Sequence, residues 1–165
     1  MILRPIAPSD QAVLWDLLHV ALWDPPPAGL RPREVLDHPG VRIYAEDWGL
    51  REGDVGVIGE IDGRIAGGCW MRLLKDGVGL GYVDNATPQL GIALFPAFQH
   101  QGHGKELMRG ALKAAKAHGY AQVSLTVHPE NSASRLYAKC GFVERELRRT
   151  YRLMVCELGP RPAPA

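Results

Sequence analysis

The sequence has few cysteines and no long hydrophobic run. Its three cysteines, Cys69, Cys140 and Cys156, are an odd number, lie far apart and form no C-x-x-C pair, which excludes a disulfide framework of the secreted kind. The apolar stretches fall well short of the ~20 residues that a membrane helix needs. The first residues also lack the basic, apolar and small-residue regions of a signal peptide. We therefore expect a cytoplasmic protein with no membrane partner.

The sequence also lacks an excess of either charge. Its 19 Lys and Arg residues stand against 18 Asp and Glu residues, whereas nucleic-acid-binding domains carry a basic surplus that neutralises phosphates. No nucleic-acid partner is expected. His100 and His103 have no third ligand near them in the sequence, so no metal site is predicted. The length and the 46% of hydrophobic residues predict a single domain at residues 1–158, followed by a disordered Pro-rich tail at 159–165.

The spacing of apolar residues switches between about two and about 3.6, which is typical of mixed strands and helices. We expect strands at 2–6, 55–61, 65–73, 89–95, 122–127, 142–148 and 151–158, and helices at about 10–22, 33–48, 102–118 and 132–139. Asp62-Gly63 suits a two-residue hairpin turn, which requires positive φ angles. The segment from 89 to 127 predicts a βαβ unit with parallel strands. The predicted fold class is α+β.

A glycine-containing loop joins the strand at 89–95 to the longest predicted helix. It contains Gln99, Gly102, Gly104 and Lys105. The first-turn amides of a helix have no intrahelical partner, and the helix dipole adds positive charge there, so this loop predicts a pyrophosphate site. A P-loop would need Ser or Thr where Glu106 stands, and a dinucleotide fingerprint would need a third glycine. The loop is therefore neither of these.

The run Gln99-x-x-Gly102-x-Gly104 resembles the acyl-CoA loop of the GNAT superfamily of N-acetyltransferases. Downstream, the run Asn131-x-x-Ser134-x-x-Tyr137-x-x-x-Gly141-Phe142 is similar to the second motif of that superfamily. Both motifs occur in the expected order with a predicted strand between them. The resemblance implies a mixed, mostly antiparallel central sheet flanked by helices, with a βαβ unit that binds acyl-CoA.

The resemblance further implies that acetyl-CoA is the co-substrate and that its acetyl group passes to a primary amine of a small molecule or peptide by direct attack. The implied acetyl-CoA-binding residues are Ala93, Leu94, Phe95, Gln99, Gln101, Gly102, His103, Gly104, Lys105, Asn131 and Ser134. Tyr137 would protonate the departing thiolate, which makes it the implied catalytic residue. Tyr137 also fits an ordinary packed helix position, and Asn131 fits an ordinary helix cap.

Two positions depart from the pattern of the superfamily. Gln89 stands where similar sequences carry a glutamate that serves as base, and an amide cannot accept a proton. Either the amine loses its proton in solvent, or the base lies elsewhere, with Glu46, Glu60, Asp84 and His128 as candidates. An acyl-CoA-binding sensor or inactive GNAT-fold module is therefore the alternative function. His100 also stands where many members have glycine.

The acceptor side is less defined by the sequence. Trp48 and Asp84 are predicted substrate-binding residues, because an aromatic face and a carboxylate together hold a cationic amine. Trp48 also fits a position in the core or pocket wall, and Asp84 fits a solvated loop charge. The last predicted strand, at 151–158, would form a sheet edge, through which two copies could pair as a homodimer. A structural or interaction protein that uses this edge is a further alternative.

Overall fold

The computed structural model describes residues 1–160, so the predicted tail at 159–165 lies outside the described residues except for its first two positions. The strands are β1 Ile2–Pro5, β2 Val55–Ile61, β3 Arg64–Arg72, β4 Gln89–Leu94, β5 Gln122–Val127, β6 Phe142–Arg148 and β7 Tyr151–Glu157. The helices are α1 Gln11–Ala21, α2 Pro39–Arg42, α3 His103–His118 and α4 Ala133–Lys139. Within the described residues, no helix is long and apolar enough to cross a membrane.

The seven strands form one sheet in the order β1-β2-β3-β4-β5-β7-β6. All neighbours are antiparallel except β4 and β5, which α3 connects as a βαβ unit. The predicted α+β fold with a mixed, mostly antiparallel sheet is thus confirmed. The expected sheet edge at 151–158 is wrong, because β7 lies between β5 and β6. The edges of the sheet are β1 and β6.

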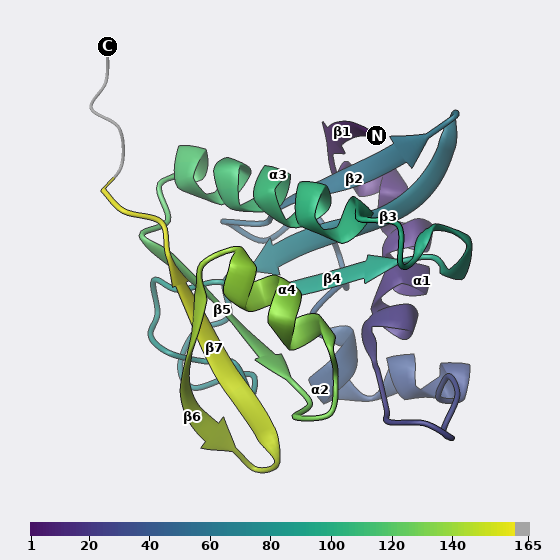
Figure 1. Cartoon of the computed structure of the whole chain (residues 1–165). Coiled ribbons are helices and arrows are strands. Elements are labelled where there is room, and N and C mark those ends of the chain that lie inside the picture. Colours follow the sequence, from purple (N-terminus) through teal and green to yellow (C-terminus); the bar gives the residue numbers. More distant parts are fainter. Residues whose placement is uncertain (161–165) are drawn as a thin grey trace.

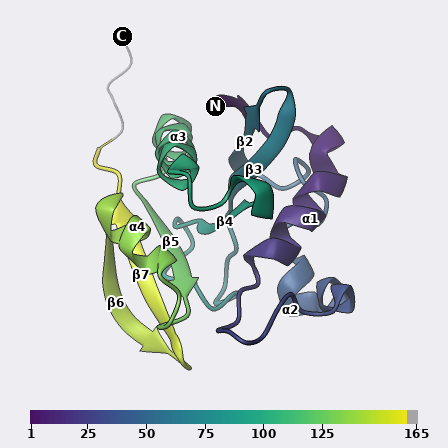
Figure 2. The same ribbon diagram turned by 45° about the vertical axis from the view of Figure 1, so that its right-hand side comes forward.

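Helices cover both faces of the sheet (Figure 1). Buried side chains form one hydrophobic cluster on each face. In β3, Cys69 and Met71 belong to the cluster that includes α3, whereas Trp70 between them belongs to the cluster that includes α1. Successive side chains of a strand point to opposite faces, so one strand serves both cores. In Figure 2, α3 and α4 lie on one side of the sheet and α1 and α2 on the other.

Local sequence signals explain most element boundaries. Asp62 and Gly63 have φ angles of 51° and 73°, which is the hairpin turn that the dipeptide predicts, and Gly119 ends α3 with a φ of 109°. The helix expected at 33–48 is broken instead into a 3-10 turn at Arg33–Asp37, the short α2 and further turns. The break falls at His38, whose extended backbone is the conformation that a following proline favours.

The strands β4 and β5 separate soon after they meet. Their ladder contains one residue pair, Gln89 with Ser124, next to a 3.0 Å hydrogen bond from the Ser124 amide to the Pro88 carbonyl. Each strand has a full antiparallel partner on its other side. The carboxyl ends of both strands therefore diverge, and this gap in the sheet positions the candidate site.

Candidate active site

A cavity of about 850 Å³ opens where β4 and β5 diverge. Its wall includes Leu18 of α1 and Trp70 from one face of the sheet, and Tyr137 of α4 from the other. The remaining lining comes mainly from the segment at 38–44, the loop at 77–81 and the ends of β4 and β5. The cavity therefore reaches from one face of the sheet to the other through the gap.

The N-terminus of α3 follows β4 directly, as the glycine loop predicts. Gly102 precedes the helix with a φ of 84°, and no atom lies within 4 Å of where its Cβ would be. Only glycine adopts this backbone readily. The amides of His103, Gly104 and Lys105 begin the helix and have no intrahelical acceptor. These exposed donors fit an anionic phosphate group.

The same helix start contacts the other expected elements. A Cβ on Gly104 would lie 3.0 Å from a methyl group of Leu136 in α4 and 3.8 Å from one of Leu94 in β4. Burial raises the pKa of the Cys140 thiol, whereas the positive charges of Arg109 and Lys105 oppose that rise. The N-terminal region of α3 thus adds side-chain cations to its dipole, beside the end of β4.

Fewer backbone groups at the end of β4 face the gap than the sequence predicts. The Phe95 amide donates a 2.9 Å hydrogen bond to Ala66, so Phe95 faces β3. Because the direction of these groups alternates along a strand, Ala93 also faces β3 and Leu94 faces the gap. The side-chain amide of Gln99 already donates to the Leu94 carbonyl at 2.8 Å. Of the predicted stretch, the Leu94 amide is the group directed at the gap.

Tyr137 and Asn131 reach the cavity from α4 and from the turn before it. The Tyr137 side chain is 9% exposed and packs against Phe142, and burial raises the pKa of its hydroxyl above the usual range. It is therefore protonated at neutral pH. Asn131 accepts a 3.0 Å hydrogen bond from the Ala133 amide, which leaves its amide nitrogen for a ligand. Ser134, the second residue of α4, does not line the cavity.

These features coincide with the comparisons to known proteins. A family model described as Acetyltransferase (GNAT) family matches residues 15–142. The chain belongs to this family.

A curated relative matches part of this GNAT chain. It is 38% identical over 87 residues to the [Ribosomal protein bS18]-alanine N-acetyltransferase of Haemophilus influenzae, a match that covers 49% of this chain and 59% of that relative. The chain thus matches less than two thirds of the length of this curated relative.

Solved structures share the whole fold at low sequence identity. They include the putative acetyltransferase yncA of Salmonella typhimurium, solved with acetyl-CoA, at a TM-score of 0.68, 20% identity and coverage of 100% and 98% of the two chains. The ribosomal-protein-S18-alanine N-acetyltransferase of Escherichia coli matches at a TM-score of 0.67, with 16% identity and coverage of 99% and 97%. This similarity shows the fold.

Gln89 holds the wall of the cavity in this GNAT chain. It is 2% exposed; its carbonyl oxygen accepts hydrogen bonds from the Tyr44 hydroxyl at 2.8 Å and the Gly81 amide at 3.1 Å, and its amide donates to the Val78 carbonyl at 2.8 Å. A Cβ on Gly79, whose φ is 92°, would collide with this amide. An ionised glutamate could not donate to Val78, so the amide itself shapes this wall.

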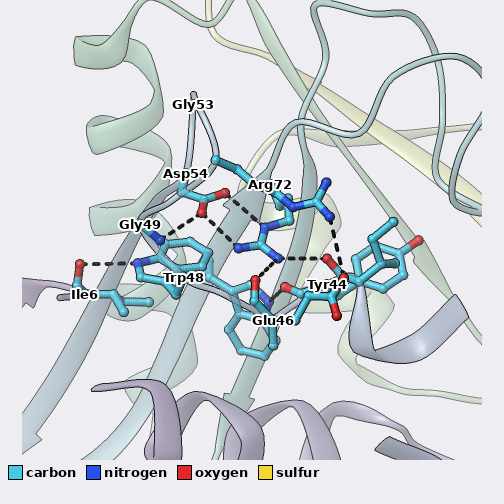
Figure 3. A network of polar contacts seen from close by, with 12 residues as sticks. Ile6, Tyr44, Glu46, Trp48, Gly49, Gly53, Asp54 and Arg72 are labelled. Carbon is cyan, nitrogen blue, oxygen red and sulfur yellow. Dashed lines mark hydrogen bonds and ion pairs between the residues drawn. The ribbon is translucent and has the colours of Figure 1, made fainter. Parts of the chain in front are cut away.

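The structure corrects the prediction for Trp48. The side chain is 3% exposed, lies in the core cluster that includes α1 and does not line the cavity. Its indole nitrogen donates to the Ile6 carbonyl at 3.3 Å, and the guanidinium of Arg72 lies 5.5 Å from its ring centre. Figure 3 shows that a cation of the chain itself already faces the Trp48 ring. No substrate amine can occupy that position.

The fully buried Arg72 fixes the segment that carries this wall. It forms two hydrogen bonds with Asp54, at 3.0 and 2.9 Å, and donates to the carbonyls of Ile43 and Glu46 (Figure 3). The Asp54 side chain is 2% exposed, so the ion pair is enclosed. The segment that presents Ile43 and Tyr44 to the cavity is therefore anchored to β3.

Asp84, the other predicted substrate-binding residue, does not line this cavity. Asp84 is exposed and accepts hydrogen bonds from the Ala86 amide at 2.9 Å and the Thr87 hydroxyl at 2.7 Å, which fixes a turn outside the cavity. Two other candidate bases also lie outside the cavity lining and form ion pairs. Glu60 pairs with Arg4, and Glu46 pairs with Arg42, each at 2.9 Å.

His128 is the candidate base that lines the cavity. Its Nδ1 accepts a 3.1 Å hydrogen bond from the Glu130 amide. In a neutral imidazole the accepting nitrogen is the basic one, so the basic nitrogen of His128 is already engaged.

Several lining residues lie outside the predicted set. Tyr44, Trp23, Tyr151 and Arg149 come from segments distant in sequence and meet only in the fold. The one local signal for this wall was the glycine-rich loop before β4, whose Gly77, Gly79 and Gly81 all line the cavity. In the described residues, no group of three or more His, Cys, Asp or Glu side chains is placed to hold a metal ion.

Proposed function

We propose that the protein is an N-acetyltransferase that moves the acetyl group of acetyl-CoA to a primary amine of a small molecule or peptide. The observation that carries this proposal is the junction of three features at one gap in the sheet: the diverging ends of β4 and β5, the free N-terminus of α3, and the buried Tyr137 hydroxyl in the adjoining cavity. Family membership supports the same activity.

Acetyl-CoA fits the groups left free around the gap. The amides from Gln101 to Lys105 would bind its pyrophosphate, with Lys105 adding charge. The pantetheine arm would extend along the gap past Leu94, towards Asn131. Relatives solved with acetyl-CoA or coenzyme A bound share this fold.

The thioester supplies an activated acetyl group, and the chain orients and stabilises the reacting groups. The Leu94 amide would donate to the carbonyl oxygen, where negative charge grows during attack. Tyr137 would deliver its proton to the departing sulfur, because its raised pKa keeps the proton in place until the thiolate forms. Direct attack by the amine needs no acyl-enzyme.

Proton removal from the amine is assigned to solvent. Among residues 1–160, no carboxylate lines the cavity, and the basic nitrogen of His128 is engaged by Glu130. The neutral fraction of the amine would therefore bind and react. This keeps the solvent route and sets aside Glu46, Glu60 and Asp84 as bases.

The test is the Tyr137→Phe variant in a free-thiol release assay with acetyl-CoA and a panel of amines. Loss of a general acid lowers kcat by roughly a hundredfold, while the KM for acetyl-CoA changes little. Tyr82→Phe is the matched control, because the Tyr82 hydroxyl bonds to Asn85 outside the cavity. Unchanged turnover in Tyr137→Phe would remove this residue from the mechanism.

The alternative of an acyl-CoA sensor is motivated by Gln89 and is distinguishable. A sensor would gain thermal stability with acetyl-CoA, since a ligand that binds the native state stabilises it, yet would release no thiol with any amine. Absence of both effects would leave the structural alternative. We also propose a cytoplasmic location, in keeping with three free cysteines, and a homodimer that pairs through an edge strand of the sheet, β1 or β6.

A further inference from the structure

The cavity wall contains cationic and aromatic side chains but no carboxylate from residues 1–160. Its basic residues are Arg31, His38, His128 and Arg149, and its aromatic residues are Trp23, Tyr44, Trp70, Tyr137 and Tyr151. Gln89 keeps the end of the cavity near the gap uncharged. An acceptor with several positive charges therefore meets no counter-charge on this wall.

Asp24 follows the lining residue Trp23 in the chain, and its carboxylate is paired with Arg31. Asp24 accepts two hydrogen bonds from Arg31, at 2.7 and 2.8 Å, and this guanidinium lowers the pKa of Asp24 below its usual range. Hydrogen bonds with Asp24, and then with Tyr151, raise the pKa of Arg31. Asp24 is thus committed to Arg31 and does not attract a substrate cation.

Arg149 is the arginine of the wall without such a partner. It lies in the turn between β6 and β7, is exposed, and forms no ion pair or hydrogen bond with the described residues. Its neighbour Arg148 donates to the carbonyls of Leu80 and Tyr82, which holds this turn against the loop before β4. The structure therefore keeps a free guanidinium at the mouth of the cavity.

An aromatic surface lines the same cavity. The ring of His128 lies between Trp23 and Tyr151, with centroid distances of 5.6 and 5.8 Å. These three residues come from the segment after α1, from the end of β5 and from the start of β7, and all line the cavity. A hydrocarbon group of the acceptor would pack against these rings.

We propose that the acceptor is an amine that also carries a carboxylate and a hydrophobic group, of the amino-acid type, and that Arg149 binds its carboxylate. This inference rests on the proposed acetyltransferase function and narrows its substrate class. A guanidinium pairs with a carboxylate through two parallel hydrogen bonds and adds selectivity for acids. Polyamines are excluded by the same charge arrangement.

The experiment compares amino acids with the amines that lack only the carboxylate: phenylalanine with phenethylamine, tryptophan with tryptamine, and leucine with 3-methylbutylamine, with spermidine added. We expect kcat/KM, expressed per neutral amine, to favour each acid by about tenfold, as for a charged contact partly screened by solvent. Arg149→Gln removes most of that preference, because kcat/KM falls for the amino acids and stays nearly the same for the amines that lack the carboxylate. Arg145→Gln removes the same charge from β6, outside the cavity, and retains the preference.

Each result has a defined meaning. Preference for the decarboxylated amines or spermidine, or an acid preference that survives in Arg149→Gln, overturns the inference while the acetyltransferase function stands. If acetyl-CoA raises the melting temperature but no member of the panel is acetylated, the acceptor class proposed here is wrong. If acetyl-CoA neither binds nor releases thiol with any amine, the proposed function itself fails.

Discussion

At the scale of single residues, the loop before α3 contains one residue in a conformation that its side chain disfavours. His100 has a φ of 60°, in the left-handed region, and Gly102 two positions later has a φ of 84°. The left-handed conformation costs roughly 1–2 kcal/mol for a residue with a Cβ. Glycine satisfies this requirement at one position, whereas histidine bears strain at the other.

His100→Gly is therefore expected to raise the free energy of unfolding by about 0.5–1 kcal/mol, the relief of strain less the entropy that glycine adds to the unfolded chain. Urea denaturation measures this change. Gly102→Ala is the converse variant: nothing crowds its Cβ position, so its expected loss of about 1 kcal/mol comes from the backbone alone. A less stable His100→Gly variant would contradict the assignment of strain.

At the scale of elements, the cavity wall depends on contacts that bring distant segments together. Asp54 and Arg72 form an enclosed pair between β3 and the loop before β2, and Gln89 joins β4 to Tyr44 and to the glycine loop. The wall therefore depends on a few polar anchors as well as on apolar packing.

Removing one partner of the buried pair tests the first anchor. Asp54→Ala leaves Arg72 charged and enclosed without its carboxylate, so we expect a loss of about 3–5 kcal/mol in the free energy of unfolding. Glu157→Gln disrupts the exposed pair with Arg145 and is expected to cost under about 1 kcal/mol. Chemical denaturation of both variants gives the comparison, and equal losses would show that burial does not matter here.

The second anchor predicts a pH-dependent effect. Gln89→Glu places an ionised carboxylate against the Val78 carbonyl and loses the hydrogen bond to it, which we expect to cost about 1–3 kcal/mol at pH 8. Burial raises the pKa of such a glutamate, and its protonated form donates again to Val78. The destabilisation is thus present at high pH and shrinks as pH falls from 8 to 5. A loss independent of pH would argue against this contact.

The difference between contacts of near neighbours and contacts of distant residues explains which features the sequence could predict. The turn at Asp62-Gly63, the cap at Gly119 and the loop from Gln99 to Gly104 depend on neighbours within a few residues, and the structure bears out those elements. Trp48 was misplaced because its cationic partner, Arg72, is distant in the chain. Arg149 was missed because nothing near it in sequence shows that Arg148 holds its turn against the cavity.

At the scale of the whole molecule, charge placement determines how the rate depends on pH. No carboxylate from the described residues lines the cavity, and burial keeps the pKa of Tyr137 above its usual value of 10.0. The amine of the substrate is thus the group whose ionisation limits the reaction, while the acid stays protonated throughout the ordinary pH range.

We expect kcat/KM to rise about tenfold per pH unit up to the pKa of the amine, because only its neutral form reacts. No decline is expected below pH 10, since Tyr137 loses its proton only above that value. Initial rates from pH 6 to 10 measure the profile, with His128→Gln as the comparison. A plateau that begins near pH 6.5 in the parent protein and disappears in His128→Gln would instead identify an enzyme base.

The passage between β4 and β5 also bears on product release. The helix start expected to hold the nucleotide belongs to the face of α3 and α4, whereas Leu18 and Trp70 line the cavity from the face of α1. Coenzyme A and the acetylated product would then leave in opposite directions. Neither departure obstructs the other, so we expect both products to dissociate in either order.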